Sequence, residues 1–236
     1  MIPHDILTLY GAKGLEYVIA IAFLVLFVPF WRYAMGTRPA PEPAFVRAAQ
    51  AAPAHSDLVE WFRVARDVFY HPGHAWARAA EAAGAVLVGA DDFAQKLVGP
   101  LRTIELPAPG TAVRQGEPAW RLHAGDKALD MLSPVDGVVT AVNREVLDNP
   151  DLLRDDPYGA GWLLQVQSPR FAAQRKGLLS GRMAHRWIED ATNALRLRMS
   201  PDLGLAMQDG GVPVDGIAQA LAPEDWDRVA REFLLS

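Results

Sequence analysis

The 236-residue chain contains no cysteine. Disulfides, iron–sulfur clusters held by this chain alone, thiol catalysis and cysteine-ligated zinc are therefore excluded. The chain also lacks a strong charge imbalance, because 23 Lys and Arg against 28 Asp and Glu give a net charge of −5 and the basic residues are scattered. This pattern argues against nucleic acid as a partner. Half of the residues are hydrophobic, which predicts one globular core with appendages.

Charges are missing from one stretch near the N-terminus, which reads YVIAIAFLVLFVPFW. The apolar segment begins at Leu15 and ends at Met35 if Arg32 extends toward the headgroups, and this length suffices to cross a bilayer. A cleaved signal peptide needs a basic leader, whereas acidic residues as well as a lysine precede this run. We therefore predict a single transmembrane helix over residues 15–35, with a buried core helix as the competing interpretation.

The charges beside this helix predict its orientation. One lysine precedes it and three arginines follow within residues 32–47, so the positive-inside rule places the C-terminal side in the cytoplasm. We expect a single-pass protein of a bacterial-type inner membrane, with residues 1–14 as a stub on the other side. Residues 36–55 are rich in Pro and Ala, which predicts a semi-extended linker.

The remaining sequence predicts a mainly β domain between helical segments. Apolar residues at helical spacing, with Ser56 as N-cap, predict an amphipathic helix over 56–70. Short β-branched runs separated by Gly and Pro then favour a sandwich or barrel. Residues 169–236 are expected to form a helical C-terminal extension, with helices over 178–198 and 223–235. Strands are predicted over residues 75–80, 85–89, 102–105, 118–123, 127–132, 137–142 and 161–167, and a short helix over 91–97.

Five blocks of this β region resemble, in order and spacing, the H protein of the glycine cleavage system. They are HAWAR (74–78), VGADDFAQKLVG (88–99), IELPAPGTAVRQGEP (104–118), SPVDGVVTAVN (133–143) and DNPDLLRDDPYGAGWLLQVQ (148–167). The resemblance covers about residues 69–168, and it implies a hybrid barrel-sandwich fold for a domain over 71–168. The anchor, the linker and most of the helical extension have no counterpart in that family.

The resemblance also implies where a lipoyl group would be attached. The lipoylated lysine of H proteins lies seven residues before the serine of the Ser-Pro-Val block and ten after the glycine of the Gly-Glu block. Counting back from Ser133 and forward from Gly116 both lead to Asp126. Lys127 thus lies one place beyond the attachment position, and successive side chains of an extended hairpin point to opposite faces. A glutamate three residues before the family lysine is replaced by His123.

Other candidate sites are weaker. His71 and His74 are separated by Pro and Gly and lack further ligands nearby, so no metal site is expected, and the resemblance implies a packing role for His74 and Trp76. The Gly-rich residues 209–216 lack the lysine of a phosphate cradle and predict a turn. The aspartates between residues 148 and 156 lack EF-hand spacing and predict a solvated loop. No catalytic residue is predicted.

Two functions remain, and neither is enzymatic. In the first, the chain is a membrane-anchored accessory subunit without a cofactor, whose degenerate H-protein-like domain docks onto integral membrane subunits of a larger complex, of respiratory or photosynthetic electron transfer. Apolar helical stripes outside the β domain favour such an interface. The alternative is a membrane-tethered lipoyl carrier with lipoate on Lys127, because the order Asp-Lys-Ala also occurs in lipoyl domains of 2-oxoacid dehydrogenase complexes.

Overall fold

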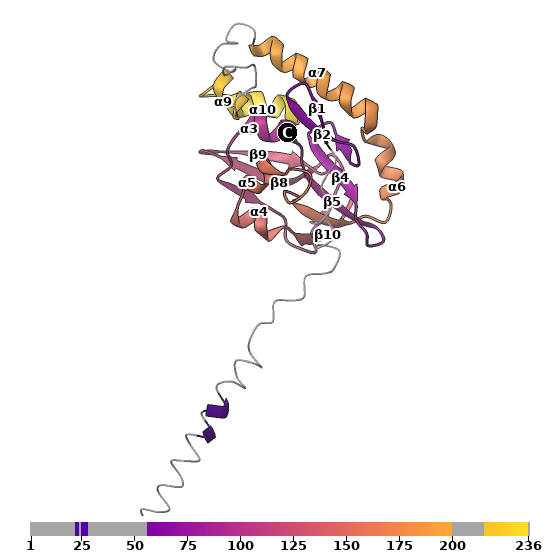
Figure 1. Cartoon of the computed structure of the whole chain (residues 1–236), viewed down its shortest axis with the longest axis vertical. Helices are drawn as coiled ribbons and strands as arrows, with labels where there is room; N and C mark the ends of the chain where they lie inside the picture. Colours follow the sequence, from indigo (N-terminus) through magenta and orange to yellow (C-terminus); the bar gives the residue numbers. More distant parts are fainter. Residues whose placement is uncertain (1–21, 24, 28–55, 200–214, 236) are drawn as a thin grey trace, which may run out of the picture. The chain divides into compact units, whose positions relative to one another are not determined.

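The computed structural model describes residues 22–23, 25–27, 56–199 and 215–235 (Figure 1). Contacts divide the chain into two units, Met1–Ala44 and Phe45–Ser236. In the first unit the described residues are helical, and the rings of Phe23 and Phe27 stack with centroids 5.2 Å apart. The rest of the predicted stub, membrane helix and linker lies outside the described residues. Within the described part of the chain, no helix has the length and apolar character that a membrane span requires.

The larger sheet of the second unit has six antiparallel strands in the order β3-β4-β5-β11-β10-β7. Strand β5 lies inside this sheet and is buried at every position, as its continuous apolar sequence AVLVGA predicts. A Cβ atom on Gly89 would lie 2.7 Å from the ring of Trp76, so this position of β5 requires glycine. The six strands are β3 (Phe69–His71), β4 (Ala75–Ala79), β5 (Ala85–Ala90), β7 (Ala112–Val113), β10 (Gly137–Val142) and β11 (Leu164–Gln167).

A second, three-stranded sheet has the order β6-β8-β9. It consists of β6 (Thr103–Glu105), β8 (Pro118–Ala124) and β9 (Lys127–Leu132). Along β8, Trp120, Leu122 and Ala124 alternate with less buried residues, so one face of this sheet packs on the core. Both sheets contribute to one continuous hydrophobic core. Each of the predicted strands has a counterpart, and the mainly β class is confirmed.

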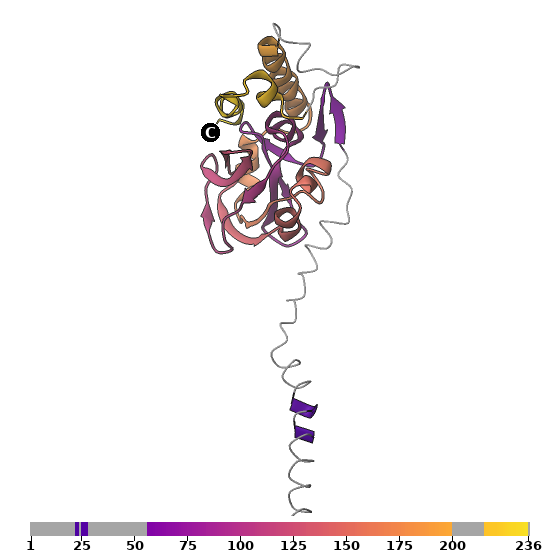
Figure 2. The same ribbon diagram turned by 90° about the vertical axis from the view of Figure 1, so that its left-hand side faces the viewer.

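The predicted amphipathic helix over residues 56–70 is wrong. The segment forms a hairpin of β1 (Ser56–Val59) and β2 (Phe62–Ala65), and its remaining residues lead into β3. Figure 2 shows the hairpin as a separate ribbon at one side of the domain. The backbone reverses at Glu60, which has a φ of 54°. On β2 the buried Phe62 and Val64 alternate with the less buried Arg63, which is the two-residue period of a strand. The apolar residues of this segment also fit the spacing of a helix, so the sequence pattern did not distinguish the two.

Helices occupy the connections and the C-terminal third. The predicted helix over 91–97 is α3 (Asp92–Val98), whose N-cap Asp91 accepts a hydrogen bond from the backbone N–H of Ala94 at 2.8 Å. The aspartates expected in a solvated loop lie in and beside two short helices instead. The C-terminal predictions correspond to α7 and α10. The other helices are α4 (Arg144–Asp148), α5 (Asp151–Asp155), α6 (Phe171–Gln174), the 3-10 turn η1 (Arg175–Gly177), α7 (Gly181–Met199), α9 (Ile217–Leu221) and α10 (Trp226–Leu234).

Candidate functional site: the β8–β9 hairpin and its cover

The hairpin between β8 and β9 presents the two residues singled out by the sequence. The register pairs Ala124 with Lys127, so the turn consists of Gly125 and Asp126. Gly125 has a φ of 60°, a left-handed conformation that glycine adopts without steric cost. Asp126 is exposed in this turn, whereas Lys127 is the first residue of β9. The side chain at the apex is therefore a carboxylate, and the amine lies one residue further along.

The amine of Lys127 is engaged by the C-terminal helix α10. Its Nζ donates a hydrogen bond to Oδ1 of Asp227 at 2.5 Å and another to the backbone carbonyl of Glu224. The side chains of Lys127 and Asp227 are each 26% exposed. The hydrogen bond from Lys127 is the main cause that lowers the pKa of Asp227 below its ordinary value, and Arg231 adds a smaller effect in the same direction. The carboxylate of Asp227 is thus ionised at neutral pH.

Helix α10 rests on the hairpin and on α3 through an apolar face. Trp226, Val229, Ala230 and Leu234 are buried, in the spacing of one helical face. The ring of Phe233 lies 5.6 Å from that of Phe93, between centroids. Sequence periodicity predicted the helix but not the surface it covers, and Asp227 was not identified, because the contact joins residues that are a hundred positions apart.

His123, at the second position that departs from the H-protein pattern, lies on β8, where it pairs with Thr103 of β6. Its Nε2 is 3.4 Å from Oε2 of Glu105, and the side chain is about one third exposed. Arg121 on the same strand donates a hydrogen bond to Asp130 at 2.8 Å and contacts Glu105 at 3.3 Å. These groups form a solvated ion cluster on the three-stranded sheet.

His71 and His74 are not brought together with further metal ligands. Nδ1 of His74 lies 2.8 Å from Oδ2 of Asp91, and the ring is stacked between Phe93 and Trp187 with centroid distances of 4.1 and 4.4 Å. His71 accepts a hydrogen bond from a neighbouring backbone N–H, and burial lowers its pKa. No cluster of three metal-ligating side chains occurs among residues 56–199 and 215–235 or at the described helical positions. His74 thus packs, as the resemblance implied.

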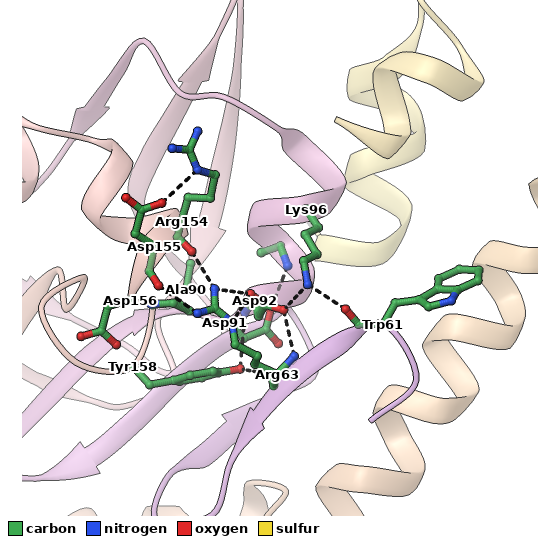
Figure 3. A network of polar contacts seen from close by, with 12 residues as sticks. Trp61, Arg63, Ala90, Asp91, Asp92, Lys96, Arg154, Asp155, Asp156 and Tyr158 are labelled. Carbon is green, nitrogen blue, oxygen red and sulfur yellow. Dashed lines mark hydrogen bonds and ion pairs between the residues drawn. The ribbon is translucent and has the colours of Figure 1, made fainter. Parts of the chain in front are cut away.

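Asp92 forms the centre of a second polar network (Figure 3). Arg63 donates hydrogen bonds to its Oδ1 from Nε at 2.9 Å and from Nη2 at 2.8 Å, and Lys96 donates to Oδ2 at 2.8 Å. Lys96 also donates to the carbonyl of Trp61, and Arg63 to the carbonyls at positions 154 and 155. The network therefore links the β1–β2 hairpin to α3 and α5. Both oxygens of the buried Asp92 carboxylate have partners, so the network offers no reactive group.

The Gly-rich residues 209–216, predicted to form a turn, lie mostly outside the described residues. Gly216, at the end of that stretch, is described, and its backbone N–H donates a hydrogen bond to the carbonyl of Lys96 at 2.9 Å. A Cβ atom on Gly99 would lie 2.7 Å from the Cα of Gly216. The two glycines therefore allow the segment before α9 to approach α3 closely.

Part of the chain is similar to known proteins. Residues 68–191 match the family model described as glycine cleavage H-protein. The glycine cleavage system H protein of Herpetosiphon aurantiacus is 32% identical over 130 residues, which cover 55% of this chain and 97% of that protein. The H protein of Mycobacterium avium is 39% identical over 107 residues, covering 45% and 80%. A crystal structure of the H protein from Mycobacterium marinum is 33% identical, covers 44% of this chain and 86% of that chain, and has a TM-score of 0.42.

Proposed function

The chain belongs to the glycine cleavage H-protein family, and on this premise we propose that it is a lipoyl carrier whose attachment residue is Lys127. Its β domain is an H-protein-like lipoyl-carrier domain. Members of this family are carriers without catalytic activity of their own, so the prediction that the chain is not an enzyme is confirmed. The accessory subunit without cofactor, which the sequence favoured, becomes the second candidate.

The position of Lys127 in the hairpin is the observation that carries this proposal. The chain has four lysines, Lys13, Lys96, Lys127 and Lys176. Among the described ones, Lys96 is held in the Asp92 network and Lys176 lies in η1, so Lys127 alone is next to the apex of β8 and β9. Lipoate attached here would form an amide with Nζ, and it would supply a disulfide that is reduced and loaded by partner enzymes. Lys127 could carry such a lipoyl arm at the hairpin once its amine is released from Asp227.

A different set of observations favours the second candidate, a docking subunit without lipoate. The count from both flanking blocks places Asp126 at the attachment position, and the amine of Lys127 is paired rather than free. In this case the domain would bind integral membrane subunits through its surface, in an electron-transfer complex or another assembly. Both candidates retain the single anchor over residues 15–35, which is supported by exposed apolar side chains at the described helical positions, such as Phe23 and Leu26.

Intact-mass measurement and peptide mapping of the chain purified from its own membranes separate the two candidates. The carrier predicts one lipoyl adduct on the peptide that contains Lys127. The adduct should disappear in Lys127→Arg and persist in the matched control Lys176→Arg, which removes an exposed lysine elsewhere. An unmodified chain that copurifies with membrane subunits, and that keeps these partners after Lys127→Arg, would support the docking subunit and eliminate the carrier.

A register variant sharpens the test. Asp126→Lys combined with Lys127→Ala moves the lysine to the position that the family count indicates. If a lipoate ligase modifies this variant but leaves the unaltered chain unmodified, the one-residue offset abolishes recognition. If the ligase modifies the unaltered chain at Lys127, the offset is tolerated at this turn and the carrier proposal stands.

A further inference from the structure

We propose that α10 is a built-in cover for Lys127 and that Asp227 positions the amine beneath it, so that the helix has to leave before this lysine is modified or meets a partner. The inference rests on the proposed function for the purpose of the cover, but its contacts can be tested without lipoate. The match to the H-protein family model ends at residue 191, whereas α9 and α10 lie beyond this residue. The cover is therefore an addition to the matched domain.

Two acceptors at the start of α10 hold the amine. They are the backbone carbonyl of Glu224, just before the helix, and the carboxylate of Asp227 in its first turn. The N-terminal end of a helix carries a partial positive charge, which alone would repel an ammonium group. The carboxylate of Asp227 compensates for this charge, and Arg231 lies 3.6 Å from its other oxygen. Asp227 thus supplies the charged contact that positions Nζ beside the Glu224 carbonyl.

The apolar contacts of α10 keep the helix in place. Leu234 and Ala230 are fully buried, and Arg231 donates a hydrogen bond to the carbonyl of Ala128 at 3.2 Å. The carbonyl of Leu234 comes so close to Gly73 that a Cβ atom there would lie 2.8 Å away. Hydrophobic burial is worth more than a half-exposed ion pair. The apolar packing therefore keeps α10 on the domain, and the ion pair with Asp227 holds Lys127 beneath the helix.

This arrangement has a direct consequence for access to Lys127. An enzyme that attaches lipoate has to take the lysine side chain into its own active site, and a docking partner has to approach the same hairpin. Both would meet α10 first. Asp126, in contrast, is exposed in the turn.

Residue-specific acetylation of the full chain in detergent micelles tests the cover. The chain is treated with a limiting amount of an amine-acetylating reagent, and the rates at Lys127 and Lys176 are compared by peptide mass spectrometry. Lys176 is exposed and serves as the internal reference. We expect Lys127 to react several-fold more slowly than Lys176. Asp227→Asn should raise the rate at Lys127 about two- to fivefold, the range for an ion pair of this exposure, and leave Lys176 unchanged.

Two further variants control this result. Glu232→Gln alters another carboxylate of α10, which pairs with Arg198 instead of the hairpin, and it should leave both rates unchanged. Leu234→Ala weakens the apolar contacts without touching the carboxylate, and it should also raise the rate at Lys127. Equal rates at Lys127 and Lys176 in the unaltered chain would overturn the cover. An unchanged Lys127 rate in Asp227→Asn would overturn the positioning role of Asp227.

The outcomes also separate this inference from the proposed function. A covered Lys127 that never acquires lipoate, even in Asp227→Asn and Leu234→Ala, would contradict the carrier and leave the cover intact. A chain that a lipoate ligase modifies at Lys127 at the same rate with and without these substitutions would support the carrier and contradict the cover.

Discussion

The helices α7 and α10 both cover the β domain, but they hold it by different means. Helix α7 inserts Trp187, whose ring lies 4.4 Å from that of His74 and 6.0 Å from that of Tyr70, between centroids. Helix α10 has a smaller apolar face and adds a half-exposed ion pair to Lys127. The match to the H-protein family includes most of α7 and none of α10. The domain therefore has one helix held by aromatic packing on two buried rings and one added helix held by weaker contacts.

The strongest way to test this difference is to remove the aromatic contact of α7. Trp187→Ala deletes a side chain that packs on two buried rings, and we expect it to lower the free energy of unfolding by about 3 kcal/mol. Denaturant unfolding followed by circular dichroism measures this loss. Met183→Ala on the same helix is the control, because Met183 is 64% exposed and should change stability little. Equal losses in both variants would contradict the assigned role of Trp187.

The corresponding substitution in α10 should have a smaller and more local effect. Leu234→Ala removes a fully buried side chain near the end of the helix, and about 2 kcal/mol is expected to be lost. Helix α10 is the last helix of the described residues, so it can open locally while the rest of the domain stays folded. Hydrogen exchange of its amides should therefore accelerate, while exchange in α7 stays unchanged. Acceleration spread evenly over both helices would show that they unfold as one unit.

The ion pair itself is expected to contribute little to stability. Asp227→Asn removes the charge but keeps a side chain that accepts a hydrogen bond, and half-exposed pairs are typically worth less than about 1 kcal/mol. The melting temperature should therefore fall only slightly, by an amount similar to that of Glu232→Gln. A loss as large as that of Leu234→Ala would mean that the pair, and not the apolar face, holds α10.

Acidification should produce the smallest effect, through the same carboxylate. The hydrogen bond from Lys127 lowers the pKa of Asp227 in the folded chain, so its contribution is present above the pKa of the unfolded chain and is lost as pH falls through the folded value. Lys127 and Arg231 are the basic groups that face this carboxylate. Hydrogen exchange of α10, corrected for intrinsic rates, should accelerate below about pH 4 in the unaltered chain. Asp227→Asn should abolish this acid-dependent step.

The sequence predicted most of the β domain because its local signals agree with one another. The run AVLVGA is a buried strand, and the strand predicted at 127–132 is β9 in full. The helix over 56–70 was wrong because its apolar spacing fits both periods, and only the reversal at Glu60 and the pairing of Arg63 with Asp92 distinguish them. These two features depend on the folded chain and leave no local signal.

The candidate site was predicted in part for a similar reason. Counting from the flanking motifs identified Asp126 and Lys127 as the residues that matter, and the hairpin places them at and beside its apex. The partner of Lys127 comes from a helix at the other end of the sequence, and the periodicity of α10 shows which side chains are apolar but not which surface they meet. Local sequence patterns therefore did not predict the contact between these two distant segments.

We expect the Asp92 network to influence how the domain responds to mechanical load, because it links β2, α3 and α5. A pull arriving along the backbone from residue 55 reaches β1 and β2 before any strand of the two larger sheets. Arg63 and Lys96 bind one carboxylate from different elements, so the pull is shared between α3, α5 and the hairpin before it can peel β3 from its neighbour. The Asp92 network would therefore limit how far such a load reaches into the larger sheets.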